Sequence, residues 1–468
     1  MSLIEERGVF YWSHDTSKER EVSGLLKIND NGNIFLFLDE FFYPDKQMPK
    51  TIVVDKEGIS FEDKFIFGTL NKTNQVIYLS GLRVFGLFFE NFQASDCLIG
   101  FDFDHDGFSE ELINPSCKQL NIPLEGFENW LCWNPIEYNK NDKEITISYK
   151  VPDDDIYLID NAEIRLTYDP NLSYGQTASL NPSANFIYTP NTPSTLKSIS
   201  DIFRSLQDLL ILLTNSEYCI KWPILTLSHN DRKYSYYFLR YTNNTKKPER
   251  HEAPIYFDHI KSNFGEIFAS WKQKSDWLGS AFYSFLGTKR GIMLYIEDHF
   301  KILVGGLEAY HRKTVETPPI PEKLQKKINR ILGNIRLNKD KKWLEHHVIK
   351  HAHISEPRLS DRLFRIIKDV QPNLDDKKVK CFSESCASIR NDLSHYAGQR
   401  KANDNTSFYQ ELVKTNEALS YLYHALILIN IGINEQLIEK WFNNSHYSYR
   451  IKKALANAKL IDKPSEIK

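Results

Sequence analysis

The sequence has few cysteines, and none of them are closely paired. Its 468 residues include six, at positions 97, 117, 132, 219, 381 and 386, without a Cys-x-x-Cys pair. This pattern argues against a disulfide framework or a zinc ribbon and is typical of a reduced protein. Long apolar runs are also missing, because the longest, residues 425–433, is about half of the roughly 20 residues that span a bilayer. The N-terminus lacks the basic start and apolar core of a secretory signal. We therefore expect a soluble, cytoplasmic protein with no membrane contact.

Net charge is small overall but unevenly distributed. The chain carries 59 Lys and Arg against 61 Asp and Glu, yet residues 1–200 sum to −15 and residues 201–468 to +13. The basic excess is densest in residues 301–400, which sum to +9. A basic region is compatible with a polyanion such as nucleic acid, whereas the acidic front half would repel one. By itself, the charge identifies no activity.

The hydrophobic pattern changes along the chain. Up to about residue 149, short β-forming runs such as SGLLKI and IFLFLDEFF alternate with turn residues and predict antiparallel strands. A further β stretch (AEIRLTYDP) and a loop rich in Pro, Ser and Thr precede a run with helical spacing, SISDIFRSLQDLLILL, and then one more hairpin. From residue 257 onward the 3.6-residue period predicts helices at 258–286, 292–313, 321–335, 340–352, 358–370, 376–397, 406–431 and 434–457.

The most informative segment is residues 380–398, KCFSESCASIRNDLSHYAG. At 100° per residue, one face of this predicted helix is apolar, while Asn391 and His395 share a stripe on the opposite side. A single histidine in a helical domain is usually a structural residue of the core. This one points away from the apolar face, beside Arg390 and an amide that can hold phosphate oxygens. Gly398 is a suitable residue to end the helix.

An arginine and a histidine that converge on one phosphodiester are sufficient to cleave RNA without a metal ion. The imidazole can take the 2′-hydroxyl proton or protonate the leaving 5′-oxygen, and the guanidinium can neutralise the phosphorane. One helix supplies only one histidine. Because a complete acid–base pair needs a second histidine, we predict a two-fold dimer in which the two copies of this helix meet at the symmetry axis.

The residues from Arg390 to His395, RNDLSH, resemble the Arg-x4-6-His motif of HEPN ribonucleases, with Asn391 following the arginine as in their typical form. A long helix containing GGLEAYHRK early in the domain and a long apolar helix after the motif agree with this resemblance. At the front of the chain, YWSHD, EVSGLLKINDNGNIFLFL and GLRVFGLFFENFQASDCLIGFDF resemble the N-terminal domain of ApeA-type antiphage HEPN proteins. The resemblance spans almost the whole chain.

The resemblance implies an effector of abortive infection, with a HEPN endoribonuclease that acts as a homodimer on tRNA or other cellular RNA. Arg390 and His395 would be catalytic, and Asn391 would orient or support them. Glu308, His311 and Arg312 on the early helix are further candidates without an assigned role. The front domain would be a sensor or a restraint, with a phage-derived protein as its trigger.

Three other groups of residues deserve a functional and a structural interpretation. Residues 102–107 (DFDHDG) match the start of an EF-hand loop, but Ile113 replaces the glutamate required at position 12, so an acidic surface loop is favoured over a calcium site. The histidines at 346, 347, 351 and 353 lack the HExxH pattern, which favours solvated or RNA-facing side chains over a metal site. Lys341, Lys342 and Trp343 could bind RNA weakly by charge and stacking, although such a face is usually only solvated.

These observations predict an α+β fold with a β-rich N-terminal region followed by an all-α HEPN helical bundle. We expect an ApeA-like sensor or regulatory region at 1–290, with a possible subdomain break near 150–195, and the HEPN ribonuclease domain at 291–468. The leading hypothesis is a metal-independent endoribonuclease that uses no cofactor. The alternatives are a non-catalytic HEPN module that binds RNA or nucleotide, and a sensor or antitoxin-like protein that depends on a separate partner.

Overall fold

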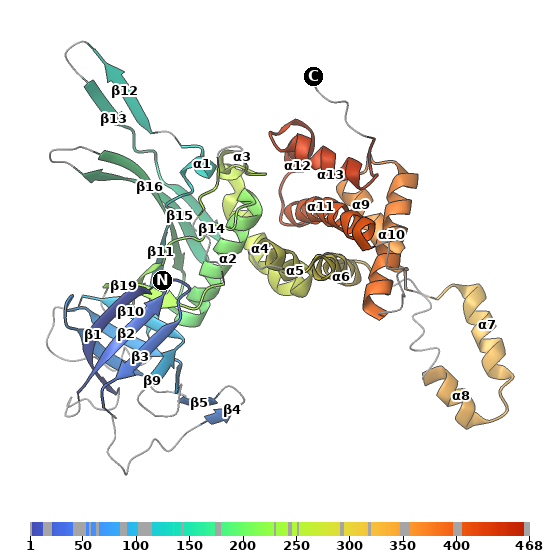
Figure 1. Cartoon of the computed structure of the whole chain (residues 1–468), viewed down its shortest axis with the longest axis horizontal. Helices are drawn as coiled ribbons and strands as arrows, with labels where there is room; N and C mark the ends of the chain where they lie inside the picture. Colours follow the sequence, from blue (N-terminus) through green and yellow to red (C-terminus); the bar gives the residue numbers. More distant parts are fainter. Residues whose placement is uncertain are drawn as a thin grey trace. The chain divides into compact units, whose positions relative to one another are not determined.

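The computed structural model divides the chain into two compact units, residues 1–271 and 272–468 (Figure 1). It describes residues 2–12, 21–40, 53–55, 58–61, 65–84, 91–101, 115–133, 135–141, 145–173, 179–228, 231–241, 246–249, 252–290, 294–316, 320–346, 356–395 and 405–462. Within these ranges, no helix has both the length and the apolar character needed to cross a membrane.

The N-terminal unit is built on antiparallel strands. They are β1 (Ser2–Trp12), β2 (Val22–Asn29), β3 (Ile34–Leu38), β4 (Val53–Asp55), β5 (Gly58–Phe61), β6 (Ile66–Leu70), β7 (Val76–Ser80), β8 (Leu82–Val84), β9 (Asn91–Ala94), β10 (Asp96–Gly100), β11 (Ser116–Pro123), β12 (Ile136–Lys140), β13 (Ile145–Tyr149), β14 (Asp155–Ile159), β15 (Ala162–Ser173), β16 (Ser179–Pro190), β17 (Ser194–Thr195), β18 (Ile224–Leu227) and β19 (Lys233–Phe238). Strand pairings connect all of these strands into one sheet, except β12 and β13, which form a separate hairpin.

Alternating side chains explain the first part of this sheet. In β2 and β3 every second residue is buried, as a strand with one covered face requires. The two strands form a hairpin in which Leu26 lies opposite Leu36, joined by the turn that the NDNGN segment predicts. Phe10, Leu26, Leu36 and Leu79 belong to one buried cluster. The predicted antiparallel strands of this region are thus confirmed.

Four helices complete the N-terminal unit or continue from it: α1 (Glu128–Leu131), α2 (Leu196–Thr214), α3 (Phe257–Ile260) and α4 (Phe264–Leu278), the last spanning the boundary between the units. Helix α2 begins where the sequence predicts, and the Thr195 hydroxyl accepts a hydrogen bond from the Ser198 amide as its cap. Its apolar face packs on β11 and β17. The α3–α4 segment brings aromatic rings against Trp130 and Phe186.

The C-terminal unit is helical. Its helices are α5 (Ser280–Lys289), α6 (Ile296–Thr314), α7 (Glu322–Gly333), α8 (Asn338–Leu344), α9 (Leu359–Val370), α10 (Asp376–His395), α11 (Asn405–Asn430), α12 (Glu435–Asn444) and α13 (Ser448–Asn457). The apolar helix α11 contacts α5, α6, α9, α12 and α13 and forms the centre of this unit. At Gly306 of α6 a Cβ atom would lie 2.3 Å from the Tyr423 hydroxyl, so the glycine permits close packing of α6 on α11.

The fold class is confirmed, because a β-rich N-terminal region precedes an all-helical one. Two predicted helices are interrupted, however. The helix expected at 258–286 divides into α3, α4 and α5, and Gly279 between the last two adopts φ +54°. The helix expected at 434–457 divides into α12 and α13, because Ser445 is extended and its hydroxyl accepts a hydrogen bond from the Tyr447 amide.

Candidate active site

Helices α6, α9 and α10 pack against one another and bring the motif next to the early helix of the C-terminal unit. In α10 the structure confirms the predicted wheel only for the side chains that it describes, which do not include His395. Phe382 and Cys386 are buried, whereas Asn391 is exposed. Arg390 lies at the edge between the two faces, with 28% of its side chain exposed. The arginine is therefore supported by the protein and accessible to solvent.

Arg390 is held by two neighbours. Its Nη2 donates a hydrogen bond to Glu308 Oε2 of α6 at 2.6 Å, and its Nη1 donates one to Asn391 Oδ1 at 3.0 Å. Both bonds fix the plane of the guanidinium group. Because an arginine has five N–H donors, three are not used by the described residues and can bind an anion. Asn391 thus contacts Arg390 directly.

Glu308 connects Arg390 to a second arginine. Its Oε1 accepts hydrogen bonds from Arg312 Nε at 3.2 Å and Nη2 at 3.0 Å. Arg312 Nη1 in turn donates to Glu356 Oε2 at 2.6 Å, which also accepts from Arg362 Nη2 at 2.7 Å. We call these five residues the arginine–glutamate network. It holds three positive charges against two negative ones.

The network determines the protonation of Glu308. Only 15% of the Glu308 side chain is exposed, and this burial alone would raise the pKa of its carboxyl group. The hydrogen bonds and positive charges of Arg390 and Arg312 outweigh burial, so the pKa of Glu308 lies below its ordinary value. Glu308 is therefore a carboxylate at neutral pH and balances part of the charge of Arg390.

His311, one turn after Glu308 on α6, is a buried histidine with 2% exposure. Within the described part of the chain, neither of its ring nitrogens has a hydrogen-bond partner. Burial, followed by the charges of Arg362, Arg365 and Arg312, lowers its pKa. A neutral, enclosed imidazole cannot exchange protons with a substrate in solution, so His311 is part of the packing between α6 and its neighbours.

The structure places the other predicted residues in different ways. His395 is the last residue of α10, and its side chain lies outside the described part of the chain. Lys341, Lys342 and Trp343 lie on α8, where no residue is buried and Trp343 is 58% exposed. The loop at 102–107, the histidines at 347, 351 and 353, and Gly398 fall outside the described residues. In the ranges that are described, no group of three or more His, Cys, Asp or Glu side chains could hold a metal ion.

Sequence reasoning named Glu308 and Arg312 without a role and missed Glu356 and Arg362. The i, i+4 spacing of Glu308 and Arg312 is a usable signal for a helical ion pair. Glu356 precedes α9 and is separated from α6 by more than 40 residues. Only the packing of α9 on α6 brings it to Arg312, so no local pattern reveals it.

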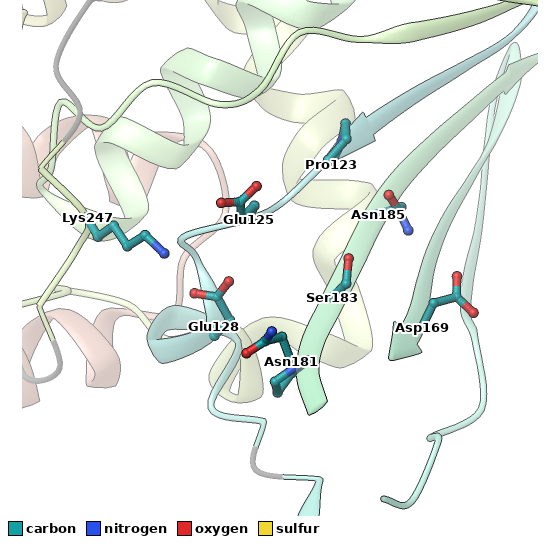
Figure 2. Close-up of a pocket in the computed structure, with 9 residues that line it drawn as sticks. Pro123, Glu125, Glu128, Asp169, Asn181, Ser183, Asn185 and Lys247 are labelled. Carbon is teal, nitrogen blue, oxygen red and sulfur yellow. The ribbon is translucent and has the colours of Figure 1, made fainter. Parts of the chain in front are cut away.

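A polar cavity of about 790 Å³ lies in the N-terminal unit (Figure 2). Glu125 lines it just before α1 and Glu128 at the start of α1, together with Asp169 of β15 and Lys247. The Gly126 amide donates to Glu128 at 2.8 Å. Glu125 and Glu128 are three residues apart in the sequence, and folding brings Asp169 and Lys247 to the same cavity. Their charge alone assigns no ligand to the cavity.

The comparisons with known proteins agree with this architecture. The family model described as ApeA N-terminal domain 1 matches residues 5–271, and the model described as Apea-like HEPN matches residues 302–437. The second match covers α7 to α11 completely and most of α6, and therefore the whole arginine–glutamate network. No curated protein and no solved structure matches the chain. The chain belongs to the ApeA family, in which an ApeA N-terminal domain precedes a HEPN domain of the nuclease type found in antiphage effectors.

Proposed function

We propose that this protein is an endoribonuclease of antiphage defence that cleaves cellular RNA at a site formed by Arg390, Asn391 and His395. The observation that carries the proposal is the state of Arg390. Its guanidinium group is fixed by Glu308 and Asn391, has donors that no described residue uses, and is partly open to solvent. A fixed cation of this kind suits a phosphate whose charge increases during reaction.

In this mechanism the 2′-oxygen of the RNA attacks the adjacent phosphorus, and the 5′-oxygen leaves. Arg390 binds the non-bridging oxygens and stabilises the phosphorane. The His395 imidazole accepts the 2′-hydroxyl proton or protonates the leaving oxygen. The products are a 2′,3′-cyclic phosphate and a 5′-hydroxyl. No metal ion takes part in any of these steps.

A homodimer supplies the second acid–base group. His395 is five residues after Arg390, so an ideal helix places it about 7.5 Å further along the axis. The nearby imidazole on α6 is that of His311, which is enclosed and cannot serve. A second copy of the HEPN domain would bring its own His395 to the same phosphodiester. We propose tRNA as the substrate and a phage protein as the trigger that acts through the N-terminal region.

The test is cleavage of total bacterial RNA in EDTA by the full chain, compared with Arg390→Ala and His395→Ala. Ser394→Ala, at an exposed position of the same helix turn, is the matched control. We expect cuts with 2′,3′-cyclic phosphate ends from the wild type and the control only. Cleavage that stops in EDTA would refute the metal-free mechanism, and equal cleavage by His395→Ala would refute the site.

If the purified protein does not cleave RNA, lysate from phage-infected cells should activate the wild type but not His395→Ala. If the wild type does not cleave RNA in that lysate either, the result would support the alternative, a HEPN module that binds RNA or nucleotide without cleaving RNA.

A further inference from the structure

A second feature of the C-terminal unit is a groove of about 720 Å³ between the first turns of α10, the first half of α11 and the end of α13. We call it the lysine groove, because Lys377, Lys378, Lys414 and Lys459 line it. Glu411 is the acidic residue of its lining. Phe382, which is almost fully buried, contributes apolar surface to it.

The lysine groove keeps a net positive charge, because four lysines stand against Glu411 and Asp462. Lys378 Nζ forms an ion pair with Asp462 Oδ1 at 2.6 Å, and Asp462 is itself nearly fully exposed. Lys377, Lys414 and Lys459 have no ion-pair partner among the described residues. Lys377 lies on α10, Lys414 on α11 and Lys459 in the turn after α13, so the fold and not one charged stretch of sequence brings them together. Such a concave surface attracts and retains an anion.

The lysine groove is separate from the site at Arg390. Lys378 and Arg390 are twelve positions apart on α10, which corresponds to about 18 Å along the axis and about 120° around it. At about 3.4 Å per stacked nucleotide, this span is about five nucleotides. One RNA strand could therefore contact both places only if it is longer than a few nucleotides.

We propose that the lysine groove is an RNA-binding exosite, which holds backbone phosphates several nucleotides away from the bond that is cut. Ammonium groups bind phosphates as point charges without reading the sequence. Ser385 and Gln410 in the same lining add neutral hydrogen-bonding groups. The identity of the anion as RNA rests on the proposed function. The basic groove itself does not depend on that function.

The test compares two double variants with the same change in net charge. Lys414→Glu with Lys459→Glu alters the groove, and Lys440→Glu with Lys453→Glu alters exposed lysines outside it. Each pair is introduced into full-length His395→Ala, so that RNA is bound and not cut. Fluorescent tRNA and a trinucleotide are the two probes, and thermal unfolding verifies that both proteins fold.

We expect the groove variant to bind tRNA about tenfold more weakly than the control variant at moderate salt. Its log–log salt slope should be smaller by roughly 1.4, which is the loss of two contacts to single-stranded phosphates. Trinucleotide binding should not change. Equal tRNA affinity and equal slopes for the two variants would overturn the proposal.

Free nucleotide is the other source of the same phosphate chemistry. Suppose that ATP binds the control variant but not the groove variant, while the two variants have equal affinity for tRNA. This result would assign the groove to a mononucleotide and reject the exosite. The outcomes also separate this proposal from the proposed function. Weak tRNA binding by the groove variant supports the exosite even if the wild type cleaves nothing, and unchanged binding rejects it even if cleavage is found.

Discussion

Glu308→Gln is the substitution that tests the arginine–glutamate network most sharply. Glutamine keeps the shape and one acceptor oxygen but removes the charge that faces Arg390 and Arg312. Hydrogen bonds to charged groups contribute about 1.5–3 kcal/mol, against about 1 kcal/mol for neutral ones. Arg312 is 46% exposed, so solvent screens its share. We expect a loss of roughly 2 kcal/mol in the free energy of unfolding.

For a unit of this size, a loss of 2 kcal/mol lowers the melting temperature by about 4–8 °C. Differential scanning calorimetry at pH 7 measures this shift. Glu322→Gln is the control, because its partner Lys326 and Glu322 itself are both highly exposed, and we expect less than about 0.5 kcal/mol there. A Glu308→Gln protein as stable as the wild type would refute the stabilising role of the network.

The same variant predicts a dependence on pH. The folded-state pKa of Glu308 is lowered, so its contribution to stability is present above the unfolded pKa of about 4.3 and is lost as the pH falls through the folded value. The stability difference between wild type and Glu308→Gln should therefore be constant from pH 6 to 8 and should shrink in acid. A difference that grows in acid would contradict the assignment.

Three further predictions concern other parts of the chain. The pKa of His311 is lowered in the folded state, so below about pH 6.5 the unfolded state binds the proton first and the wild type loses stability, by at most about 1.4 kcal/mol per pH unit. His311→Phe should remove this part of the pH dependence. Unfolding measured from pH 5.5 to 7.5 tests it. Gly306→Ala should lower the melting temperature by several degrees, since the new methyl group meets Tyr423, whereas Gly305→Ala meets nothing within 4 Å and should not. Trp343→Ala should weaken RNA binding without changing the melting temperature, and unchanged affinity would remove α8 from the RNA surface.

The sequence predicts most of the elements because their signals are local. Alternation in β2 and β3 and the helical period of α10 act within a few residues, and they correctly assign Phe382 and Cys386 to the buried face. The break at Gly279 was missed because an isolated glycine inside a helical pattern is often tolerated. Its positive φ is a consequence of how α4 and α5 are joined.

The candidate site was predicted only in part for a similar reason. Arg390, Asn391 and His395 lie on one helix, where spacing relates them directly. The partners of Arg390 and Arg312 come from α6 and from the residue before α9, and their approach depends on how three helices pack. The lysine groove is likewise assembled from α10, α11 and α13. Charge counts indicated a basic second half but could not locate this surface.

The most direct test of the central claim is sequencing of RNA with 5′-hydroxyl ends from cells that express the protein during phage infection. The account predicts new ends, concentrated in tRNA, with the wild type, and their absence with His395→Ala at equal protein level. The same ends with His395→Ala would contradict the claim that Arg390 and His395 form the cleavage site.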